Sequence, residues 1–225
     1  MTDARRSASG LTVRAARWPA LLLAVCAVGC FHIGRLPARE LYRLTLPDPV
    51  DGDSAVVTSD GPPPPLAGTL GIAQYVTPGV YGDPLIVFRI NDTEYGSYPS
   101  REWAVPLGDQ LGVVTERVLA RVPLTAEHAV FDPPSRRAQT YIWRGTVREF
   151  EEVDRGSEVR AAVRIDLRVV RAEDDSIVWS GSSRIERAVP SPNMSGIVQT
   201  LSALADEVVT DLATRARREL STRRP

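Results

Sequence analysis

Three consecutive segments in the second half of the chain alternate apolar and polar side chains, and this pattern constrains the fold most strongly. In segment 159–169, apolar residues occupy every second position, and most residues between them are charged. Segments 140–150 and 176–185 repeat the alternation. A period of two places apolar side chains on one face of a strand and polar ones on the other. Turn-prone links at 153–157 and 172–175 therefore predict an antiparallel meander with one buried face.

Two other segments carry apolar residues at helical spacing. Segment 106–120 begins with a proline, which suits the first helical turn, and its apolar residues recur three and four apart. Segment 194–219 shows the same spacing over a greater length. Shorter strands are predicted at 41–46, 66–76, 84–90 and 129–131.

The order of these elements predicts the fold class. Neither helix can bury its apolar face alone, and a sheet with one apolar face needs a cover. Packing both helices on the same side of the sheet satisfies both requirements. We therefore predict an α+β fold, a largely antiparallel sheet with two amphipathic helices packed on one face, as a two-layer sandwich.

The first thirty residues predict export and a lipid anchor. Four arginines precede an apolar run, Trp18 to Val28, that is too short to span a bilayer. This order is typical of a bacterial secretory signal over residues 1–29, and the Gly29-Cys30 junction resembles a lipobox. Cys30 is then the lipid-attachment residue, carrying a diacylglycerol and an N-acyl chain. The alternatives are an ordinary apolar anchor, or a cleaved signal with two incidental cysteines.

The residue after the cysteine bears on the destination of the protein. An aspartate at this position tends to retain a lipoprotein in the inner membrane, whereas this chain has Phe31. We therefore predict a lipid-anchored protein on the periplasmic face of the outer membrane, with the inner membrane as the alternative.

The remaining chain suits one domain without covalent cross-links. Removing residues 1–29 from the 225 leaves 196 residues and lowers the net charge from −1 to about −4, which does not indicate a nucleic-acid-binding protein. Only Cys30 remains of the two cysteines, so stability depends on core packing instead of intrachain disulfides. We divide this part into a tether at 30–40, a domain at 41–220 that includes an exposed proline-rich loop at 47–65, and a basic tail at 221–225.

The sequence holds few groups for catalysis. The only histidines are His32 and His128, and no Gly-x-Ser-x-Gly motif accompanies them. The acidic pairs 151–152 and 174–175 fall in predicted turns, where they are interpreted as solvated turn residues. We predict no enzymatic activity, no metal, and no cofactor apart from the covalent lipid on Cys30.

Several motifs are similar to those of one family. Segment 98–107, Tyr-Pro-Ser-Arg-Glu-Trp-Ala-Val-Pro-Leu, is similar to an aromatic, Arg-Trp-Ala-x-Pro-like entrance to a first helix. With the lipobox, the first strand at 41–44 and the closing helix, it makes residues 40–218 resemble the ABC-type transport auxiliary lipoproteins, the PqiC-like family. Glu102 and the long proline-rich segment depart from the family pattern.

The resemblance implies a non-enzymatic component of a lipid transport system. Such lipoproteins act with an inner-membrane ABC permease and ATPase and with an MCE-domain protein that bridges the periplasm. The chain is then expected to dock that bridge at the outer membrane, and a homo-oligomer is compatible with the sequence. We assign Tyr98, Arg101 and Trp103 as candidate partner-binding residues, with core packing as the alternative for Trp103.

Two other functions stay open at this level. A periplasmic lipoprotein that itself binds a lipid or another apolar ligand would need a dry pocket between the sheet and the helices. An assembly factor for outer-membrane components is the third possibility.

Overall fold

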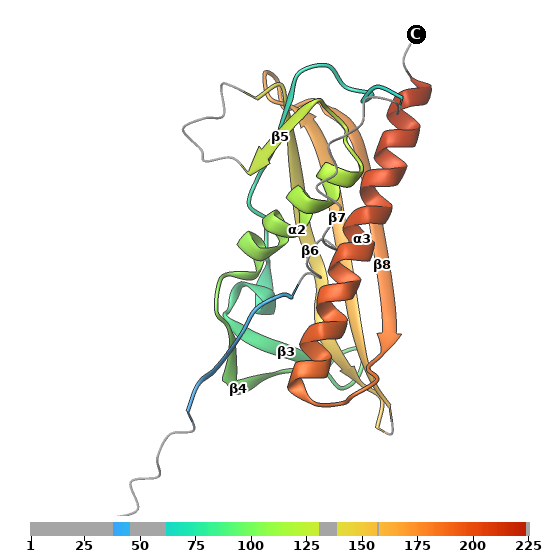
Figure 1. The fold of residues 1–225 in the computed structure, drawn as a ribbon. Helices are drawn as coiled ribbons and strands as arrows, with labels where there is room; N and C mark the ends of the chain where they lie inside the picture. Colours follow the sequence, from blue (N-terminus) through green and yellow to red (C-terminus); the bar gives the residue numbers. More distant parts are fainter. Residues whose placement is uncertain (1–37, 46–61, 131–138, 157, 224–225) are drawn as a thin grey trace, which may run out of the picture. The chain divides into compact units, whose positions relative to one another are not determined.

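The computed structural model describes residues 38–45, 62–130, 139–156 and 158–223. Nearly all of them belong to one of the two compact units of the chain, which begins at Arg39. This unit contains an eight-stranded sheet and two α-helices (Figure 1). The signal segment, Cys30 and most of the proline-rich loop lie outside the described residues.

The elements follow one another largely as the sequence predicts. In chain order they are β1 (Glu40–Tyr42), β2 (Thr69–Ile72), the 3-10 helix η1 (Gly79–Gly82), β3 (Leu85–Arg89), β4 (Tyr95–Trp103), α2 (Leu107–Arg121), β5 (Glu127–Val130), β6 (Tyr141–Asp154), β7 (Val159–Arg171), β8 (Ile177–Ala188) and α3 (Met194–Thr222). Both helices begin within a residue of their predicted starts.

The predicted meander is confirmed. Strands β6, β7 and β8 are long and pair antiparallel through two hairpins. Trp143 pairs with Val169 on the apolar face, and both side chains are fully buried. Arg144 pairs with Arg168 on the opposite face. The period-two alternation therefore assigns the two faces correctly in β7 and in β6 up to Val147. In β8 it places Ile177 with Trp179, but the register shifts between them and Ile177 is 57% exposed.

The sheet as a whole is mixed. Strand β6 pairs with β2 near its start and with β3 near its end, and both pairings are parallel. Strands β1 and β4 also pair parallel, as do β2 and β5. The α+β class is confirmed, and the antiparallel description applies to the long strands. The short strands β1, β2 and β5 pair only parallel, after long connections. Strand β3 pairs parallel with β6 and antiparallel with β4, to which a short turn joins it.

Strand β4 is the element that the sequence did not reveal. The turn predicted after Ile90 is present, since the Asn91 side chain accepts hydrogen bonds from the backbone N–H groups of Thr93 and Glu94. The chain then continues as a strand through Gly96 and Pro99, residue types that strands usually disfavour. The register between β3 and β4 shifts around Pro99, where proline's missing N–H costs no ladder bond.

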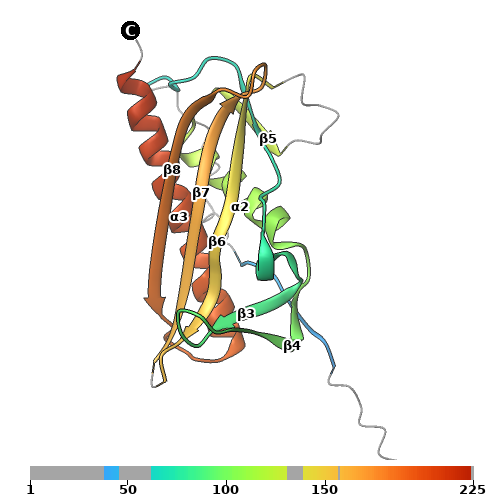
Figure 2. The same cartoon turned by 180° about the vertical axis from the view of Figure 1, so that it is seen from behind.

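Both helices cover the same face of the sheet. Helix α3 packs along β7 and β8, and α2 packs against α3, β2 and β5 (Figure 1). Seen from behind, neither α2 nor α3 covers the other face of β6, β7 and β8 (Figure 2). Neither α2 nor α3, the α-helices of the described part, is long and apolar enough to cross a membrane.

Candidate functional site

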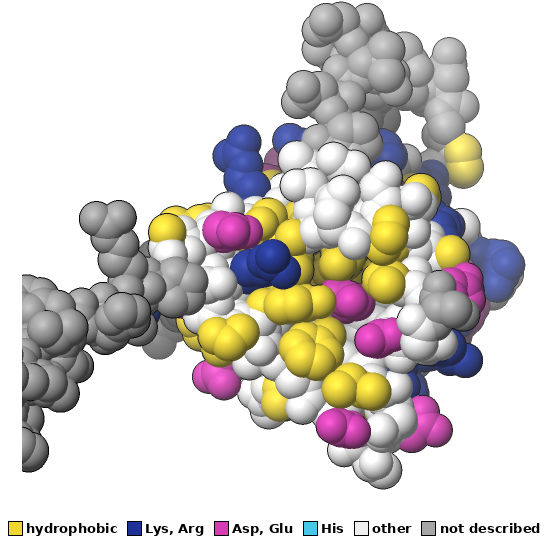
Figure 3. Space-filling model, turned by 90° about the horizontal axis from the view of Figure 1, so that it is seen from below, with side chains coloured by type: hydrophobic (Ala, Val, Ile, Leu, Met, Phe, Trp, Pro, Cys, Tyr) yellow, Lys and Arg dark blue, Asp and Glu magenta, His cyan; other side chains and the backbone are white. Residues whose placement is uncertain are grey.

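The three candidate partner-binding residues lie on β4, where this strand runs between β1 and β3. In the view from below, hydrophobic side chains gather on this end, with acidic side chains among them (Figure 3). We call the end formed by β1, β3 and β4 the β4 end.

Tyr98 and Arg101 form a cluster with Phe88, in which the two rings are tilted against each other. The ring centroids of Phe88 and Tyr98 are 4.9 Å apart, and the Arg101 guanidinium carbon lies 5.0 Å from the Tyr98 ring centroid. This places a cation over an aromatic face, a favourable contact that leaves the three side chains partly exposed. The cluster thus offers an aromatic and cationic surface at the β4 end.

Strand β1 supports this cluster. The Arg101 Nε lies 3.4 Å from the Glu40 carboxylate, and the Tyr42 hydroxyl donates to the same carboxylate at 2.5 Å. The hydrogen bond from Tyr42 holds the pKa of Glu40 below its ordinary value, and the charge of Arg101 acts in the same direction. Arg101 is therefore held between an aromatic ring and a carboxylate.

Trp103 takes a different position from Tyr98 and Arg101. Its side chain is 7% exposed and meets Phe150 in an edge-to-face contact with centroids 5.8 Å apart. The Trp103 ring therefore belongs to the core beneath the β4 end. Its role in partner binding stays a prediction. Of the three candidates, Tyr98 and Arg101 are the ones that reach the surface.

The acidic pair Glu151 and Glu152 corrects an expectation. The sequence indicated a solvated turn, but both residues lie inside β6, 0% and 6% exposed. A bulge between Val147 and Glu149 precedes them, and they point to opposite faces of the sheet. The sequence pattern did not reveal that these glutamates are buried. In a sequence, a buried charged residue cannot be distinguished from an exposed one unless its partners are known.

Each of these carboxylates has a tyrosine partner. On the helix-covered face, the Tyr98 hydroxyl donates to Glu152 at 2.6 Å. Burial raises the pKa of Glu152, although the hydrogen bond from Tyr98 opposes this shift. Burial, followed by the hydrogen bond to Glu152, also raises the pKa of Tyr98, so this hydroxyl stays protonated.

Glu151 anchors the equivalent arrangement on the other face. It accepts hydrogen bonds from the Tyr81 hydroxyl and from Arg89 Nε, the latter at 2.5 Å. Arg89 also contacts Asp92 at 3.2 Å. The Tyr81, Arg89 and Glu151 side chains tie η1, β3 and β6 together. Because the arginine and carboxylate charges are buried and paired, losing either partner is costly.

The tyrosines that pair with Glu151 and Glu152 stay protonated. Burial first, then hydrogen bonding to Glu151, raises the pKa of Tyr81, so neither Tyr81 nor Tyr98 supplies a base at neutral pH. In the part of the chain that the structure describes, no three His, Cys, Asp or Glu side chains converge as metal ligands. His128 lies at another edge, with its Nε2 3.3 Å from the Glu116 carbonyl oxygen.

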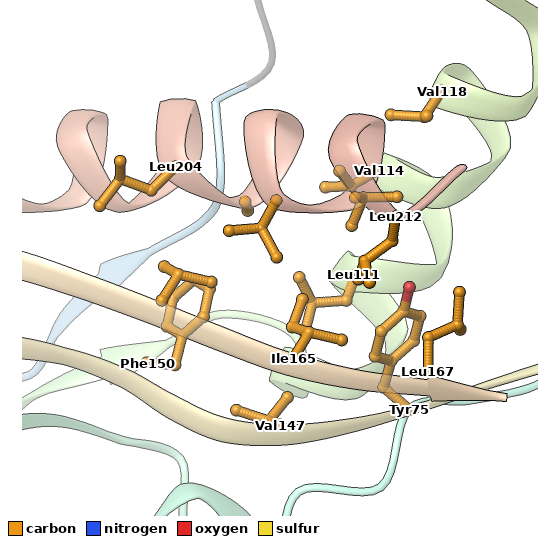
Figure 4. Packing of buried hydrophobic residues seen from close by; sticks show 14 of the residues in the cluster. Tyr75, Leu111, Val114, Val118, Val147, Phe150, Ile165, Leu167, Leu204 and Leu212 are labelled. Carbon is orange, nitrogen blue, oxygen red and sulfur yellow. The ribbon is translucent and has the colours of Figure 1, made fainter. Parts of the chain in front are cut away.

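Side chains fill the space between the helices and the sheet. Leu204 and Leu212 of α3 point toward the strands, and Leu111 of α2 points into the same layer (Figure 4). Beneath them, Ile165 and Phe150 are at most 2% exposed. The described core therefore packs directly where an apolar ligand would need room.

Comparisons with known proteins agree with this fold. The family model of the ABC-type transport auxiliary lipoprotein component matches residues 46–213, and the chain belongs to this family. The crystal structure of protein XCC0632 from Xanthomonas campestris is 20% identical, with a TM-score of 0.62, covering 80% of this chain and 95% of that one.

A second crystal structure, of an uncharacterized protein, is 15% identical with a TM-score of 0.58, covering 79% of this chain and 98% of that one. Both show the same fold. None of the curated proteins compared with the chain matches it.

Proposed function

We propose that this auxiliary lipoprotein docks an MCE-domain protein, which bridges the periplasm from an inner-membrane ABC permease and ATPase, at the outer membrane. Family membership supports a non-enzymatic role in an ABC transport system. The observation that carries the docking role is the half-exposed cluster of Phe88, Tyr98 and Arg101 at the β4 end. Aromatic and arginine side chains are the residues most often found at the centre of protein interfaces.

The chain length between the anchor and the fold fits this role. Strand β1 begins ten residues after Cys30. A fully extended leader of that length spans about 33–36 Å. With the lipid on Cys30, the chain would therefore keep β1, and the β4 end to which it belongs, within reach of the membrane surface.

Co-purification tests the docking role. The full chain carries an affinity tag and is isolated from detergent-solubilised membranes that contain the MCE-domain protein. We expect the wild type to retain that protein and Arg101→Ala to lose most of it, because truncating a central interface arginine costs about 2 kcal/mol or more. Arg218→Ala is the matched control, since Arg218 is an exposed arginine on α3, away from the β4 end.

Two results would contradict the proposal. Wild-type chain that never retains the MCE-domain protein would exclude docking. Equal retention by wild type and Arg101→Ala, with both chains folded by circular dichroism, would move the docking surface away from the β4 end.

The lipid anchor is tested separately. We expect intact mass measurement to show a diacylglycerol and an N-acyl chain on the mature wild-type protein, and neither on Cys30→Ala. The variant should also leave the membrane fraction, because no acyl chains hold it there. Unchanged membrane fractionation and lipid mass in Cys30→Ala would place the modification elsewhere.

A further inference from the structure

A groove of about 880 Å³ lies on the sheet face that no helix covers. Its floor comes from β6 and β7, and residues at the start of β8 close one side. The segment that follows β2 forms the other side through Gln74 and Val76. All of these lining residues belong to the described domain.

Basic side chains outnumber acidic ones in the groove. Its lining includes four arginines and two aspartates: Arg144, Arg148, Arg164, Arg168, Asp166 and Asp175. Each aspartate already pairs with an arginine. Arg148 Nε lies 2.7 Å from Asp166 Oδ2, and Arg144 Nη2 lies 2.8 Å from Asp175 Oδ1. The lining therefore carries two arginines beyond those in its ion pairs.

The two remaining arginines are Arg164 and Arg168. Both are exposed, and neither lies within ion-pair distance of a carboxylate of the described domain, although the charge of Arg164 acts on Asp166. They point to the same face of β7, with Cα atoms about 13 Å apart along the strand. Asp166 lies between them. Burial tends to raise the pKa of Asp166, but its contacts with Ser182 and Arg148 and the charges of Arg148 and Arg164 outweigh it and lower the pKa, so this carboxylate stays ionised.

Exposed apolar side chains also line the groove. Val76 is 59% exposed on one side of the groove, and Ile177 is 57% exposed on the other. An inorganic anion gains nothing from such neighbours, whereas a ligand with a charged head and an apolar chain does. The groove thus combines surplus positive charge with accessible apolar surface.

We propose that the groove binds the head of a single anionic phospholipid, with Arg164 and Arg168 contacting its phosphate oxygens and Val76 and Ile177 contacting the first methylenes of its acyl chains. Guanidinium groups suit phosphate because they present several N–H donors in one plane. This binding does not depend on docking of the MCE-domain protein, and the two are measured separately.

Titration of the full chain with a soluble phospholipid tests the site. The protein is purified in a non-ionic detergent and titrated with dihexanoyl phosphatidylglycerol by isothermal calorimetry. We expect saturable binding, weakened about tenfold or more by Arg164→Gln with Arg168→Gln, because two charge-assisted contacts are lost. The control combines Arg43→Gln with Arg218→Gln, which removes the same charge from exposed arginines outside the groove. It should bind within about twofold of wild type.

A second variant tests the apolar contact. Ile177→Ser should weaken phosphatidylglycerol binding about threefold or more, because an exposed side chain that covers methylenes is lost. Inorganic phosphate should bind at least tenfold more weakly than phosphatidylglycerol, and Ile177→Ser should not change its binding. Circular dichroism confirms that each variant is folded.

Four results would overturn the proposal. Absence of saturable binding to the wild type, or equal losses in the arginine variant and its charge-matched control, would exclude the site. If inorganic phosphate bound as tightly as the lipid, the groove would be a general anion site and not a phospholipid site. A hexaglutamate peptide binding as tightly would instead assign the groove to an acidic polypeptide. The docking assay on the arginine variant separates failure of this site from failure of the docking role.

Discussion

The two faces of β6 and β7 show how one pair of strands can serve two purposes. On the helix-covered face, neighbouring positions carry Trp143, Val147 and Ile165, all fully buried. On the uncovered face, the alternate positions carry arginines and carboxylates, such as Arg144, Arg148 and Asp166. The first face holds the fold together through apolar burial, and the second face is left available for charge recognition.

The difference implies that stability and binding can be changed independently. Substitutions on the covered face should alter the free energy of unfolding strongly. Substitutions at the exposed polar positions of the uncovered face should alter it little, in contrast to the buried positions on that face, such as Ile142 and Glu151, where η1 and β3 bury a charge. Four substitutions test this comparison.

Truncation on the covered face should have the largest effect. Trp143 is 0% exposed and donates from its indole N–H to the Tyr75 hydroxyl at 2.9 Å. We expect Trp143→Ala to lower the free energy of unfolding by about 4 kcal/mol, from lost burial and a residual cavity. Arg144→Ala, the next residue on the uncovered face, should cost less than about 1 kcal/mol. Urea denaturation measures both, and similar losses would remove the distinction between the faces.

The buried charge on the otherwise exposed face should have the next largest effect. Glu151→Gln removes the closest and most deeply buried anionic partner of the buried Arg89 guanidinium. We expect a loss of about 3 kcal/mol in the free energy of unfolding, by urea denaturation. Adding Arg89→Met to Glu151→Gln should recover part of that loss, because no uncompensated charge then remains. Additive losses in the double variant would show that the ion pair itself is not the cause.

Glu151 also shows where sequence reasoning ends. Periodicity predicts the meander, both helices and most inward-facing residues. It can do so because the spacing of apolar residues along the chain shows which of them lie on the same face of a strand or helix. Tyr81 and Glu151 are 70 residues apart, and their hydrogen bond depends on η1 lying over β6. Local pattern holds no information on that contact. The sequence did carry one signal for a buried carboxylate: two adjacent glutamates directly follow a long strand-like segment.

The candidate site divides in the same way. The motif around Tyr98 and Arg101 was found from a family resemblance, and the structure brings both side chains together with Phe88. The strand that carries them was missed, because Gly96 and Pro99 indicate a turn when considered locally. The ring of Phe88 lies where a side chain at Gly96 would be, since a Cβ there would come within 2.3 Å of Phe88 Cζ. A packing requirement between β3 and β4 thus explains the glycine.

A steric test on the covered face should give an intermediate effect. A Cβ added to Gly145 would lie 2.0 Å from the Tyr75 ring, so the ring must move. We expect Gly145→Ala to lower the free energy of unfolding by about 2 kcal/mol through overpacking. Thr146→Ala, one position along on the uncovered face, should change it by less than about 0.5 kcal/mol. Thermal denaturation compares them, and an unchanged melting temperature for Gly145→Ala would mean that the Tyr75 pocket yields easily.

The smallest expected effect concerns the carboxylate on the covered face and depends on pH. Burial raises the pKa of Glu152 in the folded chain above its ordinary value. The folded state therefore holds this proton at pH values where the unfolded state has lost it. Its contribution to stability is complete below about pH 4 and declines as pH rises through the folded pKa.

Glu152→Gln removes this titration, and the new amide oxygen can still accept a hydrogen bond from Tyr98. We expect the variant and wild type to differ least near pH 4, and the variant to gain relative stability toward pH 7, by less than about 1 kcal/mol. Glu173→Gln, in an exposed turn, controls for loss of a negative charge. Urea denaturation across this range provides the comparison. If the difference in stability between Glu152→Gln and wild type is independent of pH, burial does not raise the pKa of Glu152 in the folded chain.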